Sequence, residues 1–238
     1  SLLRNGSMVR VHQGSPKSIL MKKSFLVHSY LVFIIPILTL SICYSLNVIN
    51  YDLVSIPFLD GEVSISQIGR QEKTIFIFRT GFIIYSIISV FYYYKITNIL
   101  SNNHLPNNFF YYSILANTFL IIYLICLGKN EVPFNIIRRI SIILFITSMF
   151  IIHILKTKYL FKVKRGKILS IKTIYLYIIL LLIFLMSLLI IIGSPWINPF
   201  FDYPNKLKNI VEWNFMLLVL IYYIPFGLAL KKNFKSDN

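Results

Sequence analysis

Charged side chains with the chemistry to bind a phosphate group gather in a few short segments of this chain. Guanidinium groups match the geometry of phosphate oxygens, and carboxylates nearby would compete for them. The candidate cluster consists of Asp60, Glu62, Arg70, Arg79, Arg138, Arg139 and Glu212. Arg79 lies just inside an apolar run, where a guanidinium is unfavourable without a partner. Two interpretations stay open: Arg79 pairs with Glu212 or with an acid of the first loop, or the arginines bind the headgroup of an outer-leaflet lipid.

The sequence contains few residues that are candidates for catalysis. Ser64 or Ser66 beside Glu212 is the one pairing of a hydroxyl with an acid that we expect on the same side of a membrane. No histidine is expected on that side to activate a serine. Beyond residues 1–20 the chain contains three histidines, and their spacing is not that of metal ligands: His28, His104 and His153. We therefore expect no metal, no cofactor and no catalytic residues.

A run of cations without an acid follows the fourth apolar stretch. Each cation close to an anionic leaflet contributes about 1 kcal/mol of attraction. We expect this segment to contact anionic headgroups through Lys156, Lys158, Lys162, Lys164, Arg165 and Lys167. The alternative is that these residues only determine the orientation of the protein.

The elements that must position these groups are apolar helices. The chain has 238 residues, of which 57% are hydrophobic and only 13% charged, too few charges to cover a soluble domain. Runs of about 20 apolar residues are long enough to cross a bilayer. The expected spans are Phe25–Leu46, Ile75–Tyr94, Phe109–Leu127, Ile136–Leu155, Ile174–Ile192 and Trp213–Leu230. The predicted fold class is all-α: a polytopic membrane protein built as a six-helix bundle.

The charges predict the orientation of these spans. On this division, 16 of the 24 Lys and Arg residues fall on one side of the membrane, and all acids except Asp237 fall on the other. Since an excess of Lys and Arg marks cytoplasmic segments, both termini are predicted to be cytosolic. Nucleic-acid binding is not expected, because topology accounts for the net charge of +16.

The first residues differ from the rest of the chain. Met21-Lys22-Lys23 before an apolar run is typical of a natural start, so we expect residues 1–20 to be a non-native or disordered extension. Residues 21–238 then form a single domain. A cleaved signal peptide over Met21–Ser45 is the alternative to a signal anchor, but its apolar run is longer than usual.

The first outer loop contains the segment PFLDGEVSISQIGR, residues 57–70. Asp60-Gly61 is a strong signal for a two-residue turn, and Val63-Ser64-Ile65-Ser66 alternates as a strand does. We expect a short β-hairpin over the outer mouth of the bundle. An ordinary solvated loop is the alternative.

This loop and the start of the last span resemble the Frag1/DRAM/Sfk1 family. The resemblance rests on Pro57, Phe58, Ser64, Ile65, Ser66, Gly69, Glu212 and Trp213. Gln67 stands where many members carry an acid. The resemblance implies six spans with cytosolic termini and a role in membrane-lipid organisation, GPI-anchor lipid remodelling, placement of phosphoinositide kinases or autophagy.

The sequence therefore favours a non-catalytic integral membrane protein that binds or organises lipids or scaffolds a membrane partner. The expected partners are membrane lipids, anionic headgroups on the cytosolic side among them. The alternative is a membrane-embedded lipid-modifying enzyme that acts at the outer mouth of the bundle.

Overall fold

The computed structural model of the chain describes residues 16–51, 55–101, 109–163, 171–188 and 206–233. Every regular element in these ranges is a helix. The prediction of an all-α fold is therefore confirmed. The predicted hairpin is wrong, since no strand occurs among the described residues.

Eight helices are described, two of them short. Their bounds are α1 Pro16–Tyr51, α2 Ile65–Arg70, α3 Ile75–Ser101, α4 Phe109–Cys126, α5 Val132–Val163, α6 Ile171–Leu188, α8 Lys206–Ile221 and α9 Tyr223–Asn233. Five long apolar segments qualify as membrane spans by length and composition: Ser24–Tyr51, Ile75–Asn98, Phe109–Cys126, Val132–Lys158 and Lys206–Leu230. Each covers one of the expected spans, so the assignment to helical membrane proteins is confirmed.

The remaining expected span, Ile174–Ile192, corresponds to α6. Its described apolar segment, Tyr175–Met186, is shorter than a span, and residues 189–192 lie outside the described part of the chain. The structure therefore supports five spans directly, and the sixth stays a prediction.

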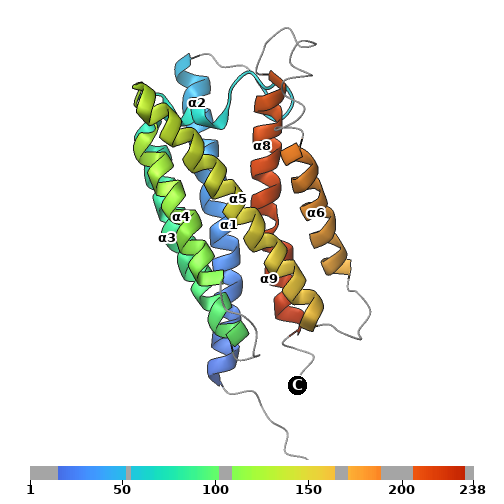
Figure 1. Cartoon of the computed structure of the whole chain (residues 1–238). Helices are drawn as coiled ribbons and strands as arrows, with labels where there is room; N and C mark the ends of the chain where they lie inside the picture. The colour runs from blue at the N-terminus through green and yellow to red at the C-terminus, as the bar shows by residue number, and fades with distance from the viewer. Residues whose placement is uncertain (1–15, 52–54, 102–108, 164–170, 189–205, 234–238) are drawn as a thin grey trace, which may run out of the picture.

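The long helices form a closed bundle (Figure 1). In chain order α1 packs on α3, α3 on α4, and α4 on α5, while α6 lies between α5 and the α8–α9 pair. Contacts of α9 and, to a smaller extent, α8 with α1 close the ring. The start of α1 and the end of α9 lie at the same end of the bundle, and α2 lies at the opposite end (Figure 1).

A proline separates α8 from α9. Pro225 has no backbone N–H, and its ring crowds the carbonyl group four residues earlier, which belongs to Ile221. Ile221 is the last residue of α8, and a single turn residue, Tyr222, precedes α9. The interruption between α8 and α9 therefore falls where Pro225 disturbs the helix.

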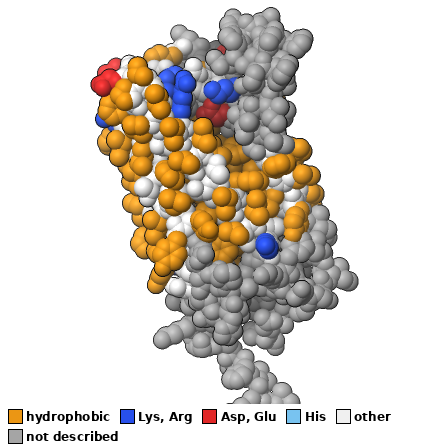
Figure 2. Space-filling view, in the orientation of Figure 1, with side chains coloured by type: hydrophobic (Ala, Val, Ile, Leu, Met, Phe, Trp, Pro, Cys, Tyr) orange, Lys and Arg blue, Asp and Glu red, His pale blue; other side chains and the backbone are white. Residues whose placement is uncertain are grey.

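A broad band of hydrophobic side chains covers the outside of the bundle, as expected for helices in lipid (Figure 2). Lysine, arginine and acidic side chains gather at the end where α2 lies (Figure 2). The centre of the bundle is unusually aromatic, and its largest fully buried side chains include Tyr85, Tyr92, Tyr93, Tyr222 and Tyr223. Of the tyrosine triplet 92–94 only Tyr94 is exposed, whereas Tyr92 and Tyr93 are fully buried.

Candidate functional site

The loop between α1 and α2 is a turn that leads into a short helix. The N–H groups of Leu59 and Asp60 donate to the carbonyl oxygen of Ile56 at 2.9 and 2.8 Å. The Asp60 carboxylate accepts from the N–H of Ile56 at 2.6 Å. Gly61 has a φ of +63°, a left-handed conformation that favours glycine. The Asp-Gly signal thus marks a turn correctly, but the chain does not return as a second strand.

A capping box replaces the expected strand after this turn. The Ser64 hydroxyl accepts from the N–H of Gln67 at 3.1 Å, and the Gln67 side chain accepts from the N–H of Ser64 at 2.7 Å. This reciprocal pattern starts α2. The residues Ser64-Ile65-Ser66 alternate between polar and apolar, which is typical of a strand. The Ser-x-x-Gln spacing from Ser64 to Gln67 is typical of a helix start, and it is the signal that predicts α2 correctly.

Three side chains of α8 hold the loop in place by donating hydrogen bonds to backbone carbonyl groups of the loop. Asn209 Nδ2 donates to the Gly61 carbonyl at 2.8 Å, and Asn214 Nδ2 donates to the Phe58 carbonyl at 3.0 Å. Between them the indole N–H of Trp213 donates to the Val63 carbonyl at 2.9 Å. Because these carbonyl groups are satisfied by one helix face, the loop has a fixed place over the end of the bundle.

Glu212 belongs to the same contact. Its carboxylate faces the backbone N–H groups of Ile65 and Ser66, which have no partner within the first turn of α2. The Ser66 hydroxyl lies 3.1 Å from that of Ser64. The two serines and Glu212 are thus brought together as expected, but they cap a helix.

The residues that carry the family resemblance build this corner of the molecule. Phe58 packs edge-on against Trp213, with ring centroids 5.5 Å apart. Ile65 and Gly69 are buried in α2, and a Cβ at Gly69 would come within 2.7 Å of the Phe78 ring. Gly69 therefore permits the close contact of α2 with α3.

The expected cluster of acids and arginines is divided by the structure. Nη2 of Arg79 donates to the carbonyl oxygen of Leu127, and Nε of Arg79 is buried without a hydrogen-bond partner. Arg79 is therefore partnered by a helix end and not by Glu212, contrary to the expected ion pair. The buried Tyr123 side chain lies close enough to Glu212, Arg138 and Arg70 for their charges to act on it. Arg139 and Glu62 are exposed.

Lys156 does not contact a membrane surface, contrary to expectation. Its side chain is fully buried, and its ammonium nitrogen lies 4.5 to 5.6 Å from the centroids of five aromatic rings, those of Tyr92, Tyr93, Tyr222, Tyr223 and Phe226. It also donates to the Tyr93 hydroxyl at 3.3 Å. Ring faces carry negative charge density, which replaces water around the cation.

The other cations of this segment divide into two groups. Lys158 is exposed, as expected. The side chains of Lys162, Lys164, Arg165 and Lys167 lie outside the described part of the structure.

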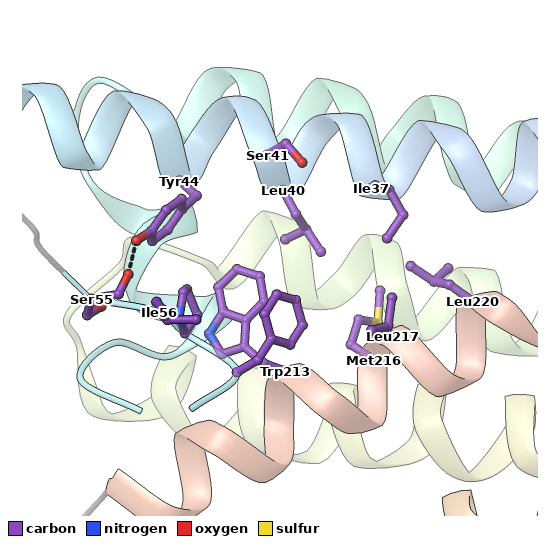
Figure 3. Close-up of a pocket in the computed structure, with 12 residues that line it drawn as sticks. Ile37, Leu40, Ser41, Tyr44, Ser55, Ile56, Trp213, Met216, Leu217 and Leu220 are labelled. Carbon is purple, nitrogen blue, oxygen red and sulfur yellow. Dashed lines mark hydrogen bonds between the residues drawn. The ribbon is translucent and has the colours of Figure 1, made fainter. Parts of the chain in front are cut away.

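An apolar pocket opens between α1 and α8, directly below the loop (Figure 3). Its volume is about 400 Å³, within the usual range of ligand pockets. Its walls are formed by Ile37, Leu40, Ser41 and Tyr44 of α1, by residues 55–58, and by Trp213, Met216, Leu217 and Leu220 of α8. The Tyr44 hydroxyl donates to the Ser55 carbonyl at its loop end (Figure 3).

The pocket lies between α1 and α8, the first of the two helices that make up the last apolar segment. On this side of the bundle, helix α1 packs more extensively on α9 than on α8. The space left between α1 and α8 is covered at one end by the loop. Ser41 and Ile56 are exposed at its rim, so it opens to the outside of the bundle. No pattern in the sequence predicts this pocket, although Trp213, one of its wall residues, carries part of the family resemblance.

Neither a metal site nor a catalytic constellation is assembled in the described residues. Within these ranges no group of three His, Cys, Asp or Glu side chains is placed to hold a metal ion. His153 is buried and stacks on the Tyr222 ring at 4.1 Å, and its Nε2 lies 3.3 Å from the Val219 carbonyl. His28 lies near Ser24 and Lys95 at the opposite end of α1 from the loop.

Comparison of the chain with protein-family models, with curated proteins and with solved structures gives no match. The resemblance to the Frag1/DRAM/Sfk1 family therefore rests on the quoted residues alone.

Proposed function

We propose that this protein is a non-catalytic membrane protein that binds a lipid, with an acyl chain of that lipid in the pocket between α1 and α8. The observation that carries the proposal is the pocket itself. It is large enough for a ligand, its walls are mostly apolar, and its rim, with Ser41 and Ile56 exposed, opens to the outside of the bundle. In a bilayer, an apolar opening at that position is in contact with acyl chains.

Polar groups at the loop end of the pocket suit the ester region of a lipid. The Ser55 hydroxyl is buried and has no hydrogen-bond partner. Buried hydroxyl groups are almost always hydrogen-bonded. A carbonyl oxygen of a lipid ester would accept from Ser55, and the rest of the chain would lie along the apolar wall towards Leu220.

The alternative of a lipid-modifying enzyme receives less support. Ser64 and Ser66 were its candidate nucleophiles, and Glu212 its acid. All three groups are engaged in the start of α2, and no histidine lies among their described neighbours. A loop held in place by α8 suits a binding protein better than a catalytic mouth. The resemblance to the Frag1/DRAM/Sfk1 family, whose members are linked to lipid organisation, supports the same choice.

The topology proposed with this function has six spans and two cytosolic termini. The number and charge distribution of the apolar segments support it. On this topology the pocket lies in the outer half of the membrane, and its lipid comes from the outer leaflet.

Two serines on α1 provide a matched test. Ser41 lines the pocket, Ser45 does not, and both are exposed one helical turn apart. Ser41→Trp should fill the pocket, whereas Ser45→Trp should place the same ring in lipid. Each purified variant is reconstituted with phosphatidylcholine that carries a photoreactive acyl chain, and the crosslinked peptides are identified by mass spectrometry.

We expect crosslinks in the wild type on α1 and α8 at residues of the pocket wall. These crosslinks should be lost in Ser41→Trp and retained in Ser45→Trp. Equal labelling of the pocket wall in the two variants would refute lipid binding at this place.

A further inference from the structure

A second polar cluster lies at the opposite end of α1. Lys95 of α3 donates to the hydroxyl oxygen of Ser24 at 2.6 Å, and its ammonium nitrogen lies 3.2 Å from Nε2 of His28. Ser24 begins the span in α1, and Lys95 lies three residues before the end of the span in α3. All three side chains are half-buried. The cluster therefore lies where an apolar span meets the headgroups.

The hydrogen bonds define the donors of this cluster. Nδ1 of His28 lies 2.7 Å from the carbonyl oxygen of Ser24, and a carbonyl oxygen only accepts. Nδ1 therefore carries the proton of the neutral ring. The ammonium nitrogen of Lys95 lies 3.2 Å from Nε2 and 3.4 Å from Nδ1, so it packs against the imidazole ring and does not lie along the lone pair of Nε2. Since Ser24 Oγ takes one of the three ammonium hydrogens, hydrogens of Lys95 and the hydroxyl hydrogen of Ser24 remain to be donated.

No acid balances this cation. Among the described residues, the partners of Lys95 are neutral. The sequence explains why: on the side of the membrane where Lys95 lies, the only acid in the predicted topology is Asp237, the penultimate residue. A half-buried ammonium group without a counter-charge favours an anionic ligand.

The cluster is also held in place before any ligand arrives. Phe25, the neighbour of Ser24, stacks on Tyr92 of α3 with ring centroids 5.3 Å apart. This contact fixes α1 against α3 three residues from Lys95. Donors fixed in this way lose little conformational entropy when they bind.

We propose that Ser24, His28 and Lys95 form a binding site for a phosphate group. Lys95 supplies the charge and one hydrogen bond, Ser24 supplies a second hydrogen bond, and the His28 ring packs against the ammonium group and limits its position. At headgroup depth the phosphate belongs to an anionic lipid of the cytosolic leaflet or to a soluble phosphate compound, and both offer the same oxygens. The site lies 17 residues along α1 from Ser41, about 25 Å away at 1.5 Å per residue, so it does not depend on the apolar pocket.

The test uses the full chain in nanodiscs of phosphatidylcholine, with phosphatidic acid added to the lipid in one arm and inorganic phosphate added to the buffer in the other. The thermal unfolding midpoint of each variant is compared with its own midpoint in phosphatidylcholine alone. Lys95→Met removes the charge, and Ser24→Ala removes one donor while it leaves the charge in place. The matched control is Lys158→Met, an exposed cation of α5.

Phosphatidic acid should raise the midpoint of the wild type and of Lys158→Met alike. Lys95→Met should need roughly tenfold more phosphatidic acid for the same rise, because a hydrogen bond to a charged group contributes about 1.5–3 kcal/mol and 1.4 kcal/mol is a factor of ten. The amount of phosphatidic acid that Ser24→Ala needs for the same rise should fall between that of the wild type and that of Lys95→Met. A Lys95-dependent rise with inorganic phosphate as well would assign the site to soluble phosphates.

Two results would overturn the proposal. One is an equal response of Lys95→Met and Lys158→Met to phosphatidic acid, which indicates only a general attraction of cations to the leaflet. The other is a wild type that responds to neither probe. If Lys95→Met does not fold, a response of Ser24→Ala equal to that of the wild type counts against the site in the same way.

Discussion

Gly61 should be essential for the position of the first loop. A Cβ added at Gly61 would lie 2.1 Å from the carbonyl oxygen of Lys206 and 2.7 Å from Cγ1 of Ile210. Both atoms belong to α8, and the first is backbone that no change of rotamer can remove. Gly61→Ala must therefore displace the loop from the helix that holds it.

The expected loss in the free energy of unfolding of Gly61→Ala has three parts. A residue with a Cβ in the left-handed conformation costs roughly 1–2 kcal/mol. The displacement lengthens the hydrogen bond from Asn209 to the Gly61 carbonyl, which contributes about 1 kcal/mol. Overpacking against backbone adds about 1–3 kcal/mol. We expect Gly61→Ala to lower the free energy of unfolding by about 3–6 kcal/mol.

Gly128 is the matched control for the conformational part. Its φ is +85°, but an added Cβ would meet only the end of the Ile75 side chain, with Cδ1 at 2.5 Å. That side chain can move, so Gly128→Ala should cost about 1–2 kcal/mol, close to the conformational penalty alone. The difference between the two variants measures the packing of the loop on α8.

Reversible unfolding in mixed micelles gives both free energies. The chain has two tryptophans, so Trp196→Phe leaves Trp213 as the fluorescent reporter of the contact between the loop and α8. The reasoning is refuted if Gly61→Ala destabilises the protein no more than Gly128→Ala does.

Three further predictions concern single contacts. Trp213→Phe keeps the aromatic ring but removes the indole N–H that binds the loop, and should lower the free energy of unfolding in the same assay by about 1–2 kcal/mol; an unchanged value would show that the contact is not stabilising. Lys156→Glu places an acid against five ring faces and should destabilise the protein by about 3 kcal/mol or more, whereas Lys158→Glu on the surface should cost less than about 1 kcal/mol; equal losses would argue against the aromatic cage. Gly81→Ala should separate α1 from α3, because the new Cβ would lie 2.1 Å from Oγ1 of Thr39, and Thr39→Ala should restore part of the lost thermal stability; a failure to restore any would place the clash elsewhere.

The spans could be predicted from the sequence because hydrophobic length is a local property. A run of about 20 apolar residues has one low-energy arrangement in lipid, a helix that satisfies its own backbone. For five of the six expected spans the described helices agree in type and in approximate bounds.

The loop was predicted incorrectly because two local signals compete in it. Val63-Ser64-Ile65-Ser66 alternates as a strand does, and Ser64-x-x-Gln67 caps a helix. What decides between them is not local: α8 offers a carboxylate to the first turn of α2 and an indole N–H to the Val63 carbonyl. A segment about 150 residues away in the chain therefore favours the helix, and the sequence gives no sign of that contact.

The prediction that Lys156 contacts lipid headgroups was wrong for a related reason. In the sequence it begins a run of cations, and no neighbouring residue distinguishes it from the others. Its environment comes from two pairs of tyrosines, 92–93 and 222–223, on helices that meet only in the folded bundle. Pairwise contacts between distant segments decide whether a cation faces lipid headgroups or ring faces, and hydropathy alone does not contain them.

The two ends of the bundle differ in how their polar groups are satisfied, and this difference bears on which ligand each end can take. At the loop end, carboxylates and amides are used within the protein, on the backbone of the loop and α2. What remains open there is an apolar pocket, suited to a chain without charge. At the other end the acids are almost absent, one cation is enclosed by rings, and Lys95 is left with neutral partners. Its unbalanced charge is suited to a phosphate. A single lipid cannot satisfy both ends, because they are separated by most of the thickness of the bilayer. The two proposals therefore require two ligands, one at each end of the bundle.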